Sequence, residues 1–212
     1  MARDLPLRYV AFGDSTSVGV GARSGGGYPD RLAERLRREG FAVELLNLGV
    51  SGATTGDLAG GRVRRIPGRP PDLVTLGIGG NDAWRMVPND TFAQRLDAIA
   101  TALELTGARV VVCNLPDLGH APAAAIAQAW LGVTPAQVTS RIRELNRFVD
   151  ALASRPRFTV VDIFGYSQRE LPGRPELFCS DGFHPSAEGY ERWAEVMWPA
   201  VLDAARRWRD EG

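Results

Sequence analysis

Five short apolar runs recur along the chain, and segments with helical periodicity separate them. The runs cover residues 8–12, 43–48, 73–77, 109–114 and 159–163. The fourth run (RVVVCN) is apolar over most of its length, as expected of a parallel strand that is buried on both faces. Strands that alternate with helices predict a parallel sheet with helices on both faces and right-handed crossovers between the strands.

Four longer helices are predicted around these strands, over residues 29–39, 91–106, 135–154 and 186–207. The second has the clearest pattern, because its apolar residues recur with a 3.6-residue period: Phe92, Leu96, Ile99 and Leu103. Asp90 is placed to cap this helix and Gly107 to end it.

Thr134 and Ser186 are the expected N-caps of the last two helices, and Pro199 is expected to interrupt and kink the last one. The longest stretch without a predicted element is 164–185. Segment 121–131 is apolar, which suits either a mobile flap over a site or a segment that packs on the sheet.

Length and charge limit the possible functions. The 212 residues, 44% of them hydrophobic, suit one α/β domain over residues 1–212. All 25 basic residues are arginine and equal the 25 acidic ones, so no basic excess indicates a nucleic-acid partner. The absence of lysine excludes a Walker-type phosphate loop. His120 and His184 are the only histidines, too few for a three-histidine metal site, and we expect no metal or other cofactor.

The cellular location is predicted from targeting signals and cysteines. The N-terminal residues 1–8 lack the apolar core of a signal peptide, and no apolar run is long enough for a membrane span. Cys113 and Cys179 are too few for a disulfide scaffold and are expected to be free thiols, with a pairing between them as the alternative. These features favour a cytoplasmic protein without stable membrane insertion, or a secreted one if the sequence is a trimmed mature form.

Ligands of open parallel sheets bind at the carboxyl ends of the strands, so functional residues are expected in the loops that follow the strands. The first loop carries Ser15 between glycines, where its hydroxyl can project into a cleft. An ordinary turn or helix cap is the alternative. A dinucleotide-binding loop fits less well, because Gly19 and Gly21 are followed by Ser24 where a third glycine is required.

The next two loops carry groups that can bind a negatively charged oxygen. Gly49 follows the second strand, and without a Cβ its backbone N–H can approach an oxyanion closely. Asn81 follows the third strand and offers a side-chain amide. A glycine required for turning the chain and an Asx-turn are the respective alternatives.

Two copies of the pattern Asp-x-x-His are present, Asp117–His120 and Asp181–His184. In either pair the acid can orient the imidazole, leaving the other ring nitrogen free to accept a proton. The second pair is followed by Pro185, which stiffens the turn that holds it. A solvated histidine in a turn is the alternative.

Taken together, these loops contain every group that acyl transfer needs. Ser15 is the candidate nucleophile, His184 the base and Asp181 the acid that orients it. The candidate oxyanion donors are the N–H groups of Ser15 and Gly49 and the side chain of Asn81.

The sequence resembles the SGNH (GDSL-type) hydrolases in four blocks, which follow the order of the family and span nearly the whole chain: Gly13-Asp14-Ser15, Gly49, Gly79-Gly80-Asn81-Asp82 and Asp181-Gly182-Phe183-His184-Pro185. The first block departs from the usual pattern, because Thr16 stands where leucine is frequent. The family places its histidine in the last block, which favours His184 over His120 as the base.

This resemblance implies a flavodoxin-like three-layer α/β/α sandwich with a central, mainly parallel five-stranded sheet. It also implies a serine esterase that forms an acyl-enzyme on Ser15, with short or medium acyl esters as the expected substrates. Lysophospholipase, thioesterase and carbohydrate deacetylase activities are alternatives, and a non-catalytic ligand-binding module of the same architecture is another. Asp14 and Asp82 are expected to hold their loops, and Trp84, Arg85 and Phe183 are candidate pocket residues.

Overall fold

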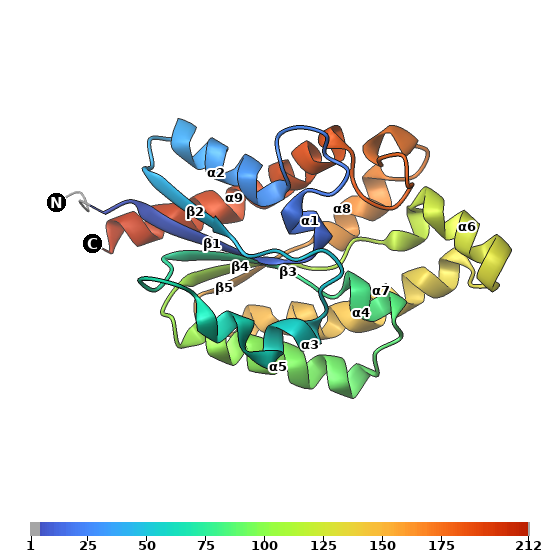
Figure 1. Ribbon diagram of the computed structural model, residues 1–212, viewed down its shortest axis with the longest axis horizontal. Coiled ribbons are helices and arrows are strands. Elements are labelled where there is room, and N and C mark those ends of the chain that lie inside the picture. The colour runs from blue at the N-terminus through green and yellow to red at the C-terminus, as the bar shows by residue number, and fades with distance from the viewer. Residues whose placement is uncertain (1–4, 212) are drawn as a thin grey trace.

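The centre of the molecule is a parallel sheet of five strands, shown in a computed structural model that describes residues 5–211 (Figure 1). The strands are β1 (Leu7–Gly13), β2 (Val43–Asn47), β3 (Leu73–Gly77), β4 (Arg109–Cys113) and β5 (Phe158–Val161). They lie in the order β2-β1-β3-β4-β5, and all neighbours are parallel. The predicted sheet is confirmed, with strand ends within two residues of those expected. Residues 1–4, part of the N-terminal segment considered above, lie outside the described range.

Helices cover both faces of this sheet and complete a three-layer α/β/α sandwich (Figure 1). One face is covered by α2 (Tyr28–Arg38) and α9 (Ala187–Asp210), the other by α5 (Asn89–Glu104) and α7 (Pro135–Asp150). The remaining helices are short or lie near the carboxyl ends of the strands: α1 (Ser15–Val18), α3 (Thr55–Asp57), α4 (Gly80–Trp84), α6 (Pro122–Leu131) and α8 (Ile163–Glu170). Single-turn segments are η1 (Leu58–Arg62), η2 (Val63–Arg65), η3 (Leu118–His120), η4 (Ala151–Ser154) and η5 (Pro175–Leu177).

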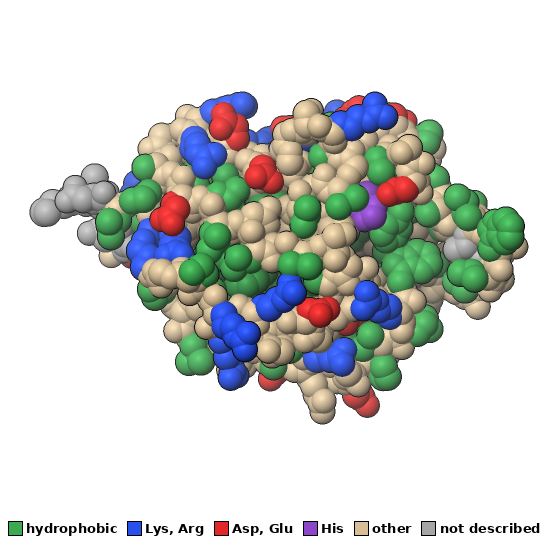
Figure 2. Space-filling view, in the orientation of Figure 1, with side chains coloured by type: hydrophobic (Ala, Val, Ile, Leu, Met, Phe, Trp, Pro, Cys, Tyr) green, Lys and Arg blue, Asp and Glu red, His purple; other side chains and the backbone are tan. Residues whose placement is uncertain are grey.

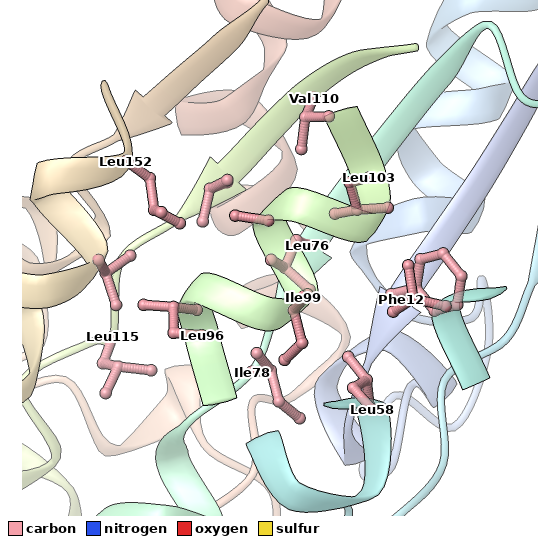
Figure 3. Close-up of a cluster of buried hydrophobic side chains, with 14 of the residues drawn as sticks. Phe12, Leu58, Leu76, Ile78, Leu96, Ile99, Leu103, Val110, Leu115 and Leu152 are labelled. Atoms are coloured by element: carbon pink, nitrogen blue, oxygen red, sulfur yellow. The ribbon is translucent and has the colours of Figure 1, made fainter. Parts of the chain in front are cut away.

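The core under α5 explains the periodicity of that helix. Leu96, Ile99 and Leu103 point from α5 toward the sheet, where they meet strand residues such as Leu76 and Val110 (Figure 3). All five side chains are buried. Burial of one apolar stripe per helix against a sheet that is itself apolar is the main force that holds the layers together.

The opposite core is built around aromatic side chains from α2 and α9. Tyr28 stacks on Trp193 with ring centroids 5.8 Å apart. At the edge of this contact, Glu191 receives hydrogen bonds from Arg31 (2.7 Å) and Arg35 (2.5 Å), which fastens α9 to α2. The 24-residue helix α9 is the longest, yet within residues 5–211 no helix combines the length and apolar character needed to cross a bilayer.

Several details of the helices differ from the expectations. Part of the stretch 164–185 is helical, because α8 begins at Ile163 and Asp162 caps it by accepting the N–H of Gly165. Helix α5 begins at Asn89, so Asp90 lies in its first turn and is not its cap. Helix α9 continues through Pro199 without ending there. The caps Thr134 and Ser186 are confirmed, since each side chain accepts an N–H of the first turn.

Segment 121–131 also differs from one of the two expectations. Most of it forms α6, whose main contacts are with α7 and η3 and not with the sheet. Figure 1 shows that α6 projects from the end of the molecule at which the strands terminate.

The site is positioned by the reversal of strand order between β1 and β3. After β1 the chain continues to β2 on one side, and after β3 it continues to β4 on the other side. This divergence opens a crevice at the carboxyl ends of β1 and β3. The two strands end side by side at Gly13 and Gly77. A Cβ on Gly13 would lie only 2.6 Å from the Gly77 carbonyl oxygen, so a side chain cannot be accommodated there.

We predict that Ile99→Ala lowers the free energy of unfolding by about 2–5 kcal/mol, because it leaves a cavity in the main core. Ile99 is 0% exposed, whereas Leu105, which directly follows the last residue of α5, is 83% exposed. Leu105→Ala is therefore the matched control and should change stability by less than about 0.5 kcal/mol. Urea denaturation followed by circular dichroism measures both, and similar losses in the two variants would contradict this account of the core.

Candidate active site

Ser15 lies two residues after the end of β1, at the first position of the short helix α1. Asp14 caps this helix, since its Oδ1 accepts the backbone N–H and the hydroxyl of Thr16, both at 2.9 Å. The hydroxyl of Ser17 donates to the buried Tyr28 hydroxyl at 2.9 Å. The loop is thus fixed on both sides of Ser15, and Ser15 itself is almost completely buried.

His184 and Asp181 meet Ser15 from the far end of the sequence. The Nε2 atom of His184 lies 2.9 Å from Ser15 Oγ, and its Nδ1 atom lies 2.6 Å from Asp181 Oδ2. Both are hydrogen-bond distances. In the neutral tautomer with the proton on Nδ1, imidazole donates to the carboxylate and accepts the serine hydroxyl proton.

The turn that carries Asp181 and His184 is held by the carboxylate itself. Asp181 Oδ1 accepts the backbone N–H groups of Phe183 (2.8 Å) and His184 (2.9 Å), and Gly182 between them has a φ of +67°. Partial burial acts to raise the pKa of Asp181, but the hydrogen bonds from the His184 ring and these N–H groups outweigh it and lower the pKa below its usual value of 3.8. Asp181 is therefore a carboxylate at neutral pH.

The other histidine lies away from this arrangement. His120 ends η3, and its Nε2 is 3.6 Å from Asp117 Oδ2. Asp117 is fully buried and also accepts the hydroxyl of Thr139 at 2.7 Å. Of the two Asp-x-x-His pairs, only Asp181–His184 reaches Ser15.

Two of the three predicted oxyanion donors face the same cavity. Ser15 and Asn81 both line it, and Asn81 donates one amide hydrogen to the carbonyl of Ala53 at 2.9 Å. This bond fixes the amide and leaves its second hydrogen available. The N–H of Ser15 has no partner within residues 5–211.

Gly49, the third predicted donor, is already engaged. Its N–H donates to Asn47 Oδ1 at 3.0 Å, and Asn47 in turn donates to the Ser17 carbonyl at 2.7 Å. Gly52, three residues on, has an N–H without a partner in the described part of the chain and directly precedes Ala53. Neither glycine lines the cavity itself. Of these two glycines, Gly52 is therefore the one whose N–H is available to a ligand.

The cavity beside Ser15 has a mostly apolar wall contributed by β4, α8 and the segment around η5. Its lining includes Leu115, Leu118, Ile163, Leu171, Leu177 and Phe178. Of the predicted pocket residues, only Phe183 lines this cavity. Trp84 lies behind it, with its ring 5.8 Å from that of Phe183, and Arg85 is exposed and donates to the Gly52 carbonyl at 3.0 Å. Trp84 and Arg85 thus do not line this cavity, although they follow Asn81 closely in the sequence.

The two thiols are free, and neither is activated. Burial raises the pKa of Cys113 to about 12 and also raises the pKa of Cys179. Both residues therefore carry protonated thiols at neutral pH, the weakly nucleophilic form. Ser15 is the better candidate nucleophile.

The two other acids of the blocks hold loops, as expected. Asp82 is completely buried and accepts the N–H (2.9 Å) and hydroxyl (2.6 Å) of Thr55, which joins α4 to α3. Burial raises the pKa of Asp14 above its usual value, although its bonds to Thr16 act in the opposite direction. Asp82 lies on the helix that carries Asn81, so it also positions that amide.

Comparison with known proteins agrees with this geometry. The sequence matches the GDSL-like lipase/acylhydrolase family over residues 11–192, which includes Ser15, Asn81, Asp181 and His184. The chain belongs to this family. GDSL-like lipases and acylhydrolases are enzymes that hydrolyse ester bonds.

Individual relatives in the GDSL-like family are distant but cover most of the chain. The chain is 30% identical over 208 residues to a GDSL-like esterase of Mycobacterium tuberculosis. The match covers 95% of this chain and 64% of that relative, so the chain spans less than two thirds of the relative's length. It is 25% identical over 196 residues to the esterase TesA of Pseudomonas aeruginosa, covering 91% and 86% of the two chains. A crystal structure of TesA superimposes with a TM-score of 0.74 at 24% identity, covering 93% of this chain and 99% of that one, which shows the shared fold.

Some residues that shape this GDSL-like site carried no signal in the sequence. Tyr190, in α9, donates to the Val20 carbonyl at 2.8 Å and so braces the loop after Ser15 from the far end of the chain. Asn47 braces the same loop through Ser17. An Asn two residues before a glycine suggests an Asx-turn, which is the one pattern that could have indicated Asn47.

We predict that Asp181 stays ionised between about pH 4 and 8, because its hydrogen bonds stabilise the carboxylate in the folded state and so lower its pKa. By linkage, this contribution to stability is present above the ordinary value of 3.8 and is lost only as the pH falls toward the lower folded-state pKa. An NMR titration that follows the carboxyl carbon of Asp181 measures this pKa. The midpoint should move upward in His184→Ala, which lacks the strongest partner, and a wild-type midpoint above pH 4 would contradict the prediction.

Proposed function

We propose that this protein is a serine esterase that hydrolyses short or medium acyl esters through an acyl-enzyme on Ser15. One observation carries the proposal: Ser15 Oγ, His184 and Asp181 form a continuous hydrogen-bonded chain, with links of 2.9 and 2.6 Å, at the wall of an apolar cavity. A binding module would not need a serine hydroxyl held against a histidine whose other nitrogen is oriented by a carboxylate.

In the first half-reaction, Ser15 Oγ attacks the acyl carbonyl while His184 Nε2 takes the hydroxyl proton. Asp181 accepts the hydrogen bond from Nδ1 and stabilises the imidazolium without itself becoming protonated, which agrees with its lowered pKa. His184 then gives the proton to the departing alcohol. In the second half-reaction, water attacks the acyl-enzyme, with His184 again acting as the base.

The negative oxygen of each tetrahedral intermediate is bound by neutral donors. Ser15 contributes its backbone N–H and Asn81 its free amide hydrogen. The loop after β2 contributes a third N–H. The sequence indicates Gly49, but the bond from Gly49 to Asn47 makes Gly52 the donor that we propose. Donors fixed before the reaction stabilise this charge without reorganisation.

The walls of the cavity support an apolar acyl group as the substrate. Leucine, isoleucine and phenylalanine side chains dominate the part of the cavity beyond Ser15. An acyl chain gains about 0.8 kcal/mol for each methylene it buries in such a pocket. The acetyl group of an acetylated carbohydrate has only a single methyl group to bury there, so the lining favours longer acyl groups over acetyl as the principal substrates.

We predict that Ser15→Ala and His184→Ala each lower kcat for p-nitrophenyl butyrate by at least roughly a thousandfold. Without either residue, the proton cannot pass from nucleophile to base. His120→Ala is the matched control, because His120 belongs to the other Asp-x-x-His pair and should leave kcat within about twofold. Near-full activity of Ser15→Ala, or a large loss in His120→Ala alone, would overturn the assignment.

We predict that Asn81→Ala lowers kcat by about 100- to 1,000-fold with little change in KM, because its amide meets the charged oxygen only in the transition state. Thermal unfolding of the variant checks that α4 remains in place. An increase in KM with kcat unchanged would instead assign Asn81 to ground-state substrate binding.

A further inference from the structure

A second apolar depression lies next to the candidate active site, between α4, α7 and the connection from α6 to α7. We call it the α6–α7 groove. Its walls include Trp84, Met86, Leu118, Leu131, Val138 and Ile142. Leu118 lines both this groove and the cavity beside Ser15, so one side chain separates the two.

Aromatic contacts lead from the candidate base to this groove. The Phe183 ring lies edge-on to His184, with centroids 5.0 Å apart, and meets Trp84 at 5.8 Å. The turn that carries Asp181 and His184 contacts α6, because the Ala123 N–H donates to the Gly182 carbonyl at 3.0 Å. Phe183 and the turn at Gly182 thus connect the candidate base to the residues around the groove.

Two apolar side chains on the rim of the groove are open to solvent, while Gln137 and Arg141 add polar groups to its lining. Met86 is 70% exposed and Leu131 is 72% exposed. Helix α6, which ends at Leu131, contains no charged residue. Figure 2 shows apolar side chains gathered at this end of the molecule, where α6 projects, and a histidine close to them.

We propose that the α6–α7 groove binds the alcohol half of the ester, and that it selects esters of medium-length alkyl or aryl alcohols. This inference rests on the proposed function. During acylation the bond between the acyl carbon and the alcohol oxygen breaks, the acyl group stays on Ser15 Oγ, and the alcohol oxygen takes its proton from His184 Nε2. The alcohol must therefore lie beside His184, from which Phe183 and Leu118 lead into the groove.

Two substrate series separate the two halves of the ester. The first keeps acetate constant and lengthens the alcohol from ethyl to octyl, and the second keeps p-nitrophenol constant and lengthens the acyl chain. In the first series, kcat/KM should rise by about fourfold for each methylene that enters the groove. In Leu131→Glu the ratio of kcat/KM for octyl and ethyl acetate should fall at least tenfold, because the carboxylate borders the bound chain.

Leu105→Glu is the matched control, since Leu105 is a similarly exposed leucine outside the groove, and it should keep the wild-type ratio. Met86→Glu tests the opposite rim and should act like Leu131→Glu. An unchanged ratio in both rim variants would overturn the proposal. So would a loss confined to the acyl series, which would assign the groove to the acyl chain. Absence of hydrolysis of every ester by the wild type would refute the proposed function itself.

Discussion

The close packing at the ends of β1 and β3 is the constraint on which the site depends. Gly13 and Gly77 lie side by side where the sheet reverses its strand order, and a Cβ on Gly13 would collide with the neighbouring strand. The chain therefore turns directly into α1 and places Ser15 above the sheet within two residues. Asp14, Ser17 and Asn47 then fix this turn through hydrogen bonds to the backbone or to buried side chains. Because two of these contacts come from Tyr28 in α2 and Asn47 in β2, the elements that form the layers also hold the nucleophile.

The last turn before α9 has the corresponding role for the base. Asp181 binds two backbone N–H groups and the His184 ring, so one carboxylate shapes the turn and orients the imidazole. The other candidate donors of the site are neutral, and no arginine lines the cavity formed by the described residues. This agrees with the complete absence of lysine from the chain, although that absence does not explain why arginine is the only strongly basic residue.

Most of the fold and the core of the site could be predicted from the sequence. The strands were recognisable because a sheet buried on both faces needs apolar runs. The spacing indicated two Asp-x-x-His pairs, and the resemblance to the SGNH hydrolases favoured Asp181 and His184 over Asp117 and His120. Helix α8 was missed because Gly165 and the polar residues after it weaken the apolar period. The engagement of Gly49 by Asn47 depends on the conformation of one loop, which residue types do not reveal. Trp84 and Arg85 follow Asn81 in the sequence, but neither lines the cavity, and Trp84 lines the α6–α7 groove instead.

The most direct test of the central claim is covalent labelling of the wild type and of His184→Ala with a fluorophosphonate, followed by peptide mass spectrometry. Attack by Ser15 Oγ on phosphorus would form an O–P bond and release fluoride, while His184 takes the proton. The account predicts a single adduct on the peptide that contains Ser15, and its loss in His184→Ala. An adduct on another residue, or active hydrolysis of esters by a protein that is not labelled at Ser15, would contradict it.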